Sequence, residues 1–303
     1  MPKAVVLTRY GPPEVLVWRD VPMPVPGPGQ VRIRVKASGV SPTDPKIRRG
    51  DLRAAFPLPA GAVLGFETAG VVDALGPSVP GVQEGDEVVS LLLGLGGYGE
   101  YALASSWTPK PPNVSWTDAA ALPASAEAAV GILKQLGAAK GETLLILGAA
   151  GSVGMIATQL AVSRGVRVIG AASPRDHDLV RDLGGVPVTY GAGLTELVRE
   201  VSPSVDAVLD AAGKGQLKDA LALAGGPARV MTLADDHAAD LGVALSAPTP
   251  DRAPEAVDQT MPLLASGGLR LRRQRHLPLA DAAEAHRLLD KGEAHEKLVL
   301  EAQ

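Results

Sequence analysis

The chain has 303 residues, of which 46% are hydrophobic and 20% charged, as in a soluble globular protein long enough for two domains. Its 29 basic and 33 acidic residues give a net charge of −4, which argues against nucleic-acid or membrane-surface binding, because either needs a basic face. The chain contains no cysteine, so disulfides, thiolate metal sites and a cysteine nucleophile are excluded. We find no secretory leader pattern and no apolar run long enough for a bilayer, and we expect a cytoplasmic protein.

The first third of the chain is rich in Pro and Gly and contains short β-like runs. Residues 31–36, Val-Arg-Ile-Arg-Val-Lys, alternate apolar and charged side chains, which is typical of a half-buried strand. Many short strands separated by Gly and Pro turns predict a small β-barrel or sandwich. The expected strands are 3–8, 15–19, 30–38, 70–75 and 86–91.

From about residue 118 the pattern changes to strands that alternate with helices. An Ala- and Leu-rich helix is expected over 118–137, and a first buried strand over 143–147. Strictly alternating units of this kind predict a parallel, doubly wound sheet. The other expected elements here are helices 152–164, 175–183, 194–201 and 216–223, and strands 166–171, 186–190, 205–209 and 229–233.

After about residue 268 the pattern returns to strands, with a strand over 269–277, a helix over 280–289 and a strand over 297–300. We therefore predict an α/β domain over 122–264, inserted into a β-rich domain formed by 1–121 and 265–303. Four arginines in the returning segment have alternate spacing, and we expect them on a solvated face of its strand. These arginines are Arg270, Arg272, Arg273 and Arg275.

The strongest local signal is Thr143–Gly154, where a buried strand leads through a glycine turn into a helix. Gly148 permits a tight exit from the strand, Gly151 lets the backbone approach a pyrophosphate, and Gly154 lets the helix pack on the sheet. The helix N-terminus then offers unpaired N–H groups and a positive dipole end to phosphate. Glycine turns also simply join strands to helices, so a structural alternative stays open. The predicted contacts are Gly148, Ala149, Ala150, Gly151, Ser152, Val153 and Gly154.

The second strand of the α/β part decides which dinucleotide is expected. An NAD site usually ends this strand with an acid for the ribose 2′-hydroxyl, and no acid stands at its tip here. Ser173 can donate to a 2′-phosphate, Arg175 can pair with it through a fork, and His177 is a further donor candidate. We therefore predict NADPH, while a plain helix start with Ser173 as N-cap is compatible with the same residues. Tyr190 and Ala211 complete the predicted cofactor-binding set.

Several segments in order resemble the medium-chain dehydrogenase/reductase superfamily, in its zinc-independent quinone oxidoreductase branch. The similarity covers nearly the whole chain, and it implies a GroES-like β-barrel domain from both chain ends with a Rossmann domain between them. It also implies an active cleft at their junction and a homodimer formed through an edge strand at 241–246. The matching segments are Gly39-Val40-Ser41-Pro42-Thr43-Asp44, Leu64–Gly76, Gly148–Gly154 and Val205–Gly213.

The resemblance also bears on metal binding. Zinc-dependent relatives place a cysteine where Ser41 stands and a histidine where Phe66 stands, beside the glutamate Glu67. Phenylalanine cannot ligate zinc and serine is a poor ligand, so we expect neither a catalytic nor a structural zinc. Glu67 is then expected to keep a structural hydrogen bond in the barrel.

Without a metal, the chemistry implied is direct hydride transfer from NADPH to a quinone or an α,β-unsaturated carbonyl. Ser41 or Lys46 would donate to the oxygen that gains charge, and Asp44 would orient the loop or the nicotinamide ribose. The run Ser41–Asp44 is equally consistent with a capping or turn motif. Glu127 is a proton-donor candidate if it faces the cleft and a solvated helix residue if it does not.

Two functions stay open at this point. The first is an NADPH-dependent reductase of quinones or enones, including a biosynthetic enoyl reductase. The second is a non-enzymatic NADPH-binding sensor or structural protein. In both cases we expect a small-molecule ligand, no nucleic acid and no membrane as partners, and a homodimer.

Overall fold

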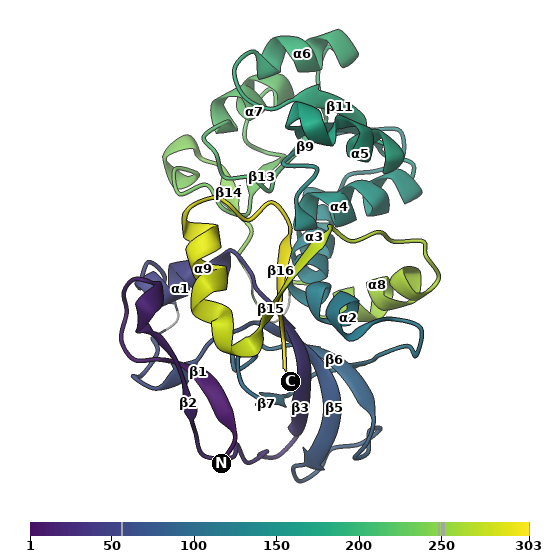
Figure 1. Ribbon diagram of the computed structural model, residues 1–303. Helices are drawn as coiled ribbons and strands as arrows, with labels where there is room; N and C mark the ends of the chain where they lie inside the picture. Colours follow the sequence, from purple (N-terminus) through teal and green to yellow (C-terminus); the bar gives the residue numbers. More distant parts are fainter. Residues whose placement is uncertain (56, 248, 250–251, 303) are drawn as a thin grey trace. The chain divides into compact units, whose positions relative to one another are not determined.

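The computed structural model describes residues 1–55, 57–247, 249 and 252–302, which form two compact units (Figure 1). The β unit comprises Met1–Ala124, Val257–Gly268 and Arg273–Gln303, and the α/β unit comprises Ser125–Ala256 and Leu269–Arg272. Both chain ends belong to the β unit, so the α/β unit is an insertion in its sequence. The domain limits at 122 and 264 stay a prediction.

Seven strands within the described residues form the larger sheet of the β unit, in the order β15-β16-β3-β5-β6-β8, with β7 paired to β3. Along β3 every second side chain is buried, because alternate residues of a strand point to opposite faces. Val31, Ile33 and Val35 thereby enter one core with Val72 and Val88. The strands are β3 (Val31–Gly39), β5 (Glu67–Leu75), β6 (Glu87–Leu91), β7 (Tyr101–Ala104), β8 (Thr108–Pro109), β15 (Gln274–Pro278) and β16 (Lys297–Glu301).

A second core of the β unit joins a small sheet to two helices. The small sheet has the order β2-β1-β4, and its Val5 and Leu7 pack with Ile47 and Leu288. The strands are β1 (Lys3–Leu7), β2 (Leu16–Asp20) and β4 (Ala62–Val63), and the helices of the unit are α1 (Thr43–Arg49), α2 (Trp116–Ala121), α8 (Ala256–Ala265) and α9 (Ala282–Asp290).

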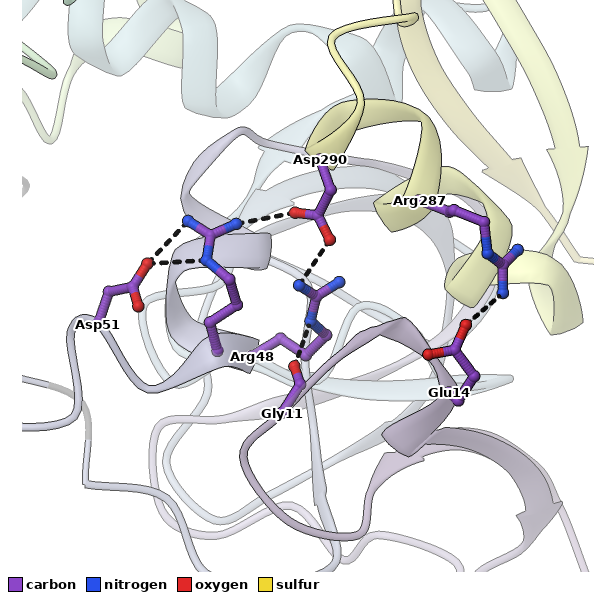
Figure 2. Close-up of polar contacts among 7 residues, drawn as sticks. Gly11, Glu14, Arg48, Asp51, Arg287 and Asp290 are labelled. Atoms are coloured by element: carbon purple, nitrogen blue, oxygen red, sulfur yellow. Dashed lines mark hydrogen bonds and ion pairs between the residues drawn. The ribbon is translucent and has the colours of Figure 1, made fainter.

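Helix α1 is held to α9 by a buried arginine (Figure 2). Arg48 is fully buried, and its Nε donates to the Gly11 carbonyl at 3.0 Å while Nη2 donates to Asp290 at 2.7 Å. Arg49 donates to the other oxygen of Asp290 at 2.8 Å. Because removing one partner would leave a buried charge unpaired, this group fixes the far end of the helix that begins at the Ser41–Asp44 turn.

The α/β unit contains the predicted doubly wound sheet, with six parallel strands in the order β11-β10-β9-β12-β13-β14. Leu145 and Leu147 of β9 pack with α6 and α7 on one face, and α4 and α5 cover the strands from the other (Figure 1). The strands are β9 (Thr143–Leu147), β10 (Arg167–Ala172), β11 (Val186–Thr189), β12 (Ala207–Asp210), β13 (Val230–Thr232) and β14 (Ala244–Leu245). The helices are α3 (Pro123–Leu136), α4 (Ser152–Ser163), α5 (His177–Asp182), α6 (Leu194–Val201) and α7 (Leu217–Ala224).

Two predicted elements are corrected by the structure. The helix expected over 118–137 is broken at Leu122 into α2 and α3, and Pro123 takes the first position of α3, where its missing N–H costs nothing. The strand expected over 269–277 begins only at Gln274, because Leu269–Arg272 belongs to the α/β unit. Among the described residues no helix is long and apolar enough to cross a membrane.

Candidate functional site

Close backbone packing shapes the glycine turn after β9. Gly148 has φ +82°, which favours glycine, and the N–H groups of Gly148 and Ala149 both donate to the Ala171 carbonyl at 3.0 and 3.1 Å. A Cβ on Gly154 would lie 2.2 Å from the Gly148 oxygen, closer than atoms can approach. Two of the three glycines are therefore required by the local geometry, so the turn fixes where the next helix begins.

The N-terminus of α4 opens at this turn without a side-chain cap. Gly151 is the extended N-cap, with φ −75° and ψ 167°, and the N–H of Met155 donates to its carbonyl at 2.9 Å. The N–H groups of Ser152, Val153 and Gly154 precede that bond and have no partner within the helix. Donors that point out of a helix N-terminus suit an anion, and the glycine cradle leaves room for the diphosphate of a dinucleotide.

The segment after β10 holds an acid that sequence reasoning overlooked. Ser173 donates through Oγ to Asp176 at 2.6 Å, and Nε of Arg175 lies 3.6 Å from the same carboxylate. The Arg175 side chain is 59% exposed, so a ligand can reach it. Asp176 was visible in the sequence as the third residue after Ser173, a spacing typical of a helix start. Any 2′-phosphate at this strand tip therefore meets Asp176 as well as Arg175.

Two further predicted cofactor contacts carry buried polar atoms without a well-formed hydrogen bond among the described residues. These atoms are Nε2 of His177 and the hydroxyl of Tyr190. Burial raises the pKa of Tyr190 to about 12, and the charges of Asp210 and Asp235 add to the shift. Buried polar groups are normally paired, so Nε2 of His177 suits a ligand that would complete its hydrogen bonding, whereas the Tyr190 hydroxyl also interacts with the Lys214 backbone.

Asp210, at the end of β12, organises the segment that holds Ala211. Its side chain is 1% exposed; Oδ1 accepts from the N–H groups of Ala212 and Gly213 at 3.0 Å each, and Oδ2 accepts from Thr232 at 2.8 Å. A Cβ on Gly148 would lie 3.2 Å from the Cβ of Ala212, so this segment and the glycine turn are neighbours. Ala211 is thus placed at the carboxyl edge of the sheet, where such folds bind ligands.

In the β unit, Ser41 and Asp44 form a hydrogen-bonded turn at the start of helix α1. The N–H of Ser41 donates to Oδ2 of Asp44 at 2.7 Å, and the N–H of Thr43 donates to Oγ of Ser41 at 3.2 Å. Both bonds belong to a turn at the N-cap residue Pro42, which has no side-chain cap, so the turn alternative describes the local structure. Asp44 is fully buried, and burial raises its pKa to about 7 against the opposing Ser41 N–H. Lys46 follows on α1 and is half-buried.

A buried aromatic pair lies in the same core. The Tyr98 hydroxyl and Nε2 of His286 are 3.2 Å apart, and the rings meet edge to face with centroids 5.7 Å apart. Burial, together with the positive charge of Arg48, lowers the pKa of His286 to about 3. Burial and the neighbouring charge of Asp44 raise the pKa of Tyr98 well above its usual value. Both rings are therefore neutral, and Tyr98 is a packing residue of this core.

Glu67 and Phe66 have structural contacts. Glu67 is fully buried; Oε2 accepts from the N–H of Ala124 at 2.8 Å and Oε1 is paired with Lys297. A Cβ on Gly39 would lie 2.2 Å from Oε1, so that glycine is needed for the approach. Phe66 is 5% exposed within the apolar core. Among the described residues no three His, Cys, Asp or Glu side chains are grouped to hold a metal ion.

Glu127 is not the solvated residue that one alternative predicted. It is 5% exposed; Oε1 accepts from Nε of Arg252 at 2.6 Å, and Oε2 accepts from Nη2 of the same arginine. Nη1 of Arg252 donates to the Ser246 carbonyl at 2.7 Å. The α/β unit buries this ion pair inside itself, and Gly131 makes room for it, since a Cβ there would lie 2.5 Å from Arg252. Both carboxylate oxygens are occupied, so we propose no proton-donor role for Glu127.

Comparison with known proteins agrees with this architecture. A family model described as "Alcohol dehydrogenase GroES-like domain" matches residues 27–111, and one described as "Zinc-binding dehydrogenase" matches 185–300. A quinone oxidoreductase of Pseudomonas aeruginosa is 30% identical over 312 residues, covering 94% of this chain and 95% of that protein. The chain belongs to the medium-chain dehydrogenase/reductase superfamily and is quinone oxidoreductase-like.

Two other similarities add detail. A 2-methylene-furan-3-one reductase of Solanum lycopersicum is 33% identical over 210 residues, which cover 65% of this chain and 53% of that protein. The solved structure of a mycobacterial protein complexed with NADPH has a TM-score of 0.85 at 28% identity, covering 99% of this chain and 100% of that chain. Apart from the Pseudomonas protein, the chain spans about half the length of several curated relatives that it matches.

The superfamily membership confirms the predicted fold class, a GroES-like β domain with a Rossmann domain. The predicted site residues fall into two groups, each within one unit. The β unit holds Ser41, Asp44 and Lys46, and the Rossmann unit holds the glycine turn with the remaining cofactor candidates. Sequence reasoning missed Asp176 and Asp210, although each stood within three residues of a predicted contact.

Proposed function

We propose that the protein is an NADPH-dependent, zinc-independent reductase that transfers hydride to a quinone or an α,β-unsaturated carbonyl, with a biosynthetic enoyl reduction included. The observation that carries the proposal is the glycine cradle at the start of α4, in a chain of this superfamily. The names of two relatives, a quinone oxidoreductase and a furanone reductase, point to acceptors of this type.

The zinc-independent part of the proposal rests on the residues at the ligand positions of zinc-dependent relatives. Phe66 has no donor atom, and its ring is packed in the core of the β unit. Ser41 accepts a hydrogen bond from the Thr43 N–H in the turn before α1, and the chain has no cysteine. This donor set does not suit Zn²⁺, which prefers thiolate and imidazole ligands. An acceptor that takes hydride without a Lewis acid fits this β unit best.

When bound, NADPH supplies the hydride. The residues of the chain bind the substrate, orient it and donate hydrogen bonds to it. Ser41 accepts one hydrogen bond through Oγ, which leaves its hydroxyl proton to donate to an oxygen that gains charge. Asp44 holds the Ser41 backbone and so fixes where that hydroxyl lies. Lys46, on helix α1 after this turn, is the second donor that we propose. The predicted position of this loop beside the nicotinamide follows from the family resemblance.

The preference for NADPH is a proposal supported by Arg175 and by the missing acid at the end of β10. Asp176 opposes it, because the carboxylate is paired with Arg175 and accepts from Ser173. A 2′-phosphate must therefore displace Asp176 from Arg175 to form its own fork. We propose that the 2′-phosphate displaces Asp176. Because this displacement costs free energy, the affinity for NADPH should exceed that for NADH only moderately.

A homodimer in the cytoplasm completes the proposal. Strand β14 is one of the two edge strands of the Rossmann sheet as described, the other being β11, and its Leu245 is 56% exposed. An exposed apolar edge strand is suited to pairing with a second copy. Sedimentation of the protein together with a Leu245→Lys variant tests this, because only a dimer at this edge is weakened by the charge.

The test of the activity is the oxidation of NADPH by the purified protein with a panel of quinones and enones. We expect turnover with at least one acceptor class, and a loss of tenfold or more in Ser41→Ala, since removing one oxyanion donor is costly. Ser106→Ala, on an exposed loop of the same unit, is the control and should retain the wild-type rate. Binding of NADPH without oxidation across the panel favours the sensor or structural alternative.

A further inference from the structure

Arg272 differs in its surroundings from the other three arginines that were expected on a solvated face. Arg270, Arg273 and Arg275 are exposed, whereas Arg272 is half-buried and belongs to the Rossmann unit. A Cβ built on Gly151 would lie 3.8 Å from Nη1 of Arg272, so its guanidinium stands beside the N-cap of α4. The expected strand does not form here, since β15 begins at Gln274, and Arg272 is less exposed than the other three arginines.

A side chain of α4 determines where Arg272 lies. Nε2 of Gln159 donates to the Arg270 carbonyl at 2.9 Å, and the Arg270 N–H donates back to Oε1 at 2.7 Å. Gln159 stands about two turns after the start of α4, since a turn takes 3.6 residues. From this clamp the chain runs two residues toward the N-terminus of the helix, and Arg272 reaches Gly151. The position of Arg272 therefore rests on the two hydrogen bonds between Gln159 and Arg270 and on the short distance from Arg272 to Gly151.

We propose that Arg272 binds the diphosphate bridge of the dinucleotide, together with the unpaired N–H groups at the start of α4. The helix end offers only about half a positive charge against the two formal charges of a diphosphate. Arg272 adds a full charge and a planar fork of N–H donors that suits two phosphate oxygens. Gly151 has no side chain to stand between the fork and those N–H groups. The inference rests on the dinucleotide binding of the proposed function.

The diphosphate role differs in a measurable way from a role at the 2′-phosphate. NADPH and NADH share the diphosphate, and only NADPH has the 2′-phosphate. Loss of Arg272 must therefore weaken both dinucleotides by the same factor. Loss of Arg175, after β10, must weaken NADPH and leave NADH unchanged. This contrast assigns each arginine to one phosphate group of the cofactor.

The experiment is a calorimetric titration of the full chain with NADPH and with NADH, for wild type, Arg272→Ala, Arg272→Lys and Arg175→Ala. We expect a loss of about ten- to hundredfold for both dinucleotides in Arg272→Ala, as for one charge-assisted hydrogen-bonded pair. Arg272→Lys should lose less, because the charge stays while the fork is lost. Arg275→Ala removes the same charge from an exposed position and should bind as wild type does. Thermal melting confirms that each variant is folded.

Three results overturn the inference. One is an Arg272→Ala variant that binds both dinucleotides as wild type does, and another is one that loses affinity for NADPH alone. The third is a wild-type chain that binds neither dinucleotide, which overturns the proposed function as well. The two proposals can also fail separately. If the wild-type chain binds both dinucleotides, Arg272→Ala weakens both and no acceptor is reduced, the inference is supported and the proposed reductase activity is not.

Discussion

The two loops that carry the candidate site are built on different principles. In the Rossmann unit the turn after β9 depends on the backbone and on missing side chains, since Gly148 needs its positive φ and Gly154 has no room for a Cβ. In the β unit the turn at Ser41 is joined to buried side chains that meet across long stretches of sequence, since Nζ of Lys297 donates to the carbonyl of the preceding Val40 at 3.1 Å. Glu67 pairs with Lys297, and Tyr98 meets His286. The conformation of the first loop can be predicted from neighbouring residues in the sequence. The contacts around the second form only when distant parts of the chain fold together.

The largest effect is expected from breaking the buried ion pair of Glu67 and Lys297. Lys297→Met should lower the free energy of unfolding by about 3–5 kcal/mol, because Glu67 is left buried and unpaired. Urea unfolding measures the loss. The double variant Glu67→Leu/Lys297→Met should be more stable than Lys297→Met alone, since it removes the isolated charge. A single variant within about 1 kcal/mol of wild type contradicts this account.

The second prediction uses pH on the same loop. Burial raises the pKa of Asp44 to about 7 from its usual 3.8, so its contribution to stability is complete below pH 3.8 and is lost as the pH rises through 7. Relative to Asp44→Asn, wild type should lose on the order of 4 kcal/mol over that window. His286 acts oppositely, since its pKa is lowered to about 3, but it is common to both proteins. Unfolding at several pH values measures the difference, and parallel pH curves would refute it.

The third prediction addresses the backbone loop. Gly154→Ala places a Cβ 2.2 Å from the Gly148 oxygen, so the start of α4 must shift away from the sheet. We expect a loss of about 1–3 kcal/mol in stability, as for overpacking, together with a loss of dinucleotide binding. Gly94→Ala is the matched control, because nothing lies within 4 Å of its Cβ. Thermal unfolding measured by calorimetry gives the stability of both variants, and titration with the dinucleotide gives their affinity. A Gly154→Ala variant that binds the dinucleotide as wild type does would contradict the prediction.

The smallest expected effect concerns Asp176. Asp176→Asn removes the charge that competes for Arg175, so the affinity for NADPH should rise about two- to fivefold, as expected of a single exposed charge pair. The affinity for NADH should not rise, because it lacks the 2′-phosphate that Asp176 repels. Paired titrations with both dinucleotides give the ratio. An equal gain for both cofactors would show that Asp176 does not act on the 2′-phosphate.

What the sequence predicts follows the same contrast. Strand 143–147 and helix 194–201 are found with the predicted limits, because their apolar periodicity and their flanking glycines are local signals. Helix α1 was missed, since Pro42 stands at its N-cap and Pro45 within its first turn, and the run Ser41–Asp44 is typical of a turn. No local pattern gives the partner of Glu127, because Arg252 lies 125 residues further along the chain. The same holds for Arg272, which reaches Gly151 only through the clamp of Gln159 on Arg270.

The central claim is direct, metal-independent hydride transfer by this chain, and isotope transfer tests it most directly. The protein is dialysed against a chelator and supplied with an enone and NADPH that carries deuterium at the transferred position of the nicotinamide. The account predicts one deuterium at the β-carbon of the saturated product, at a rate that added zinc does not change. A product without deuterium, or a product that forms only after zinc is returned, would contradict it.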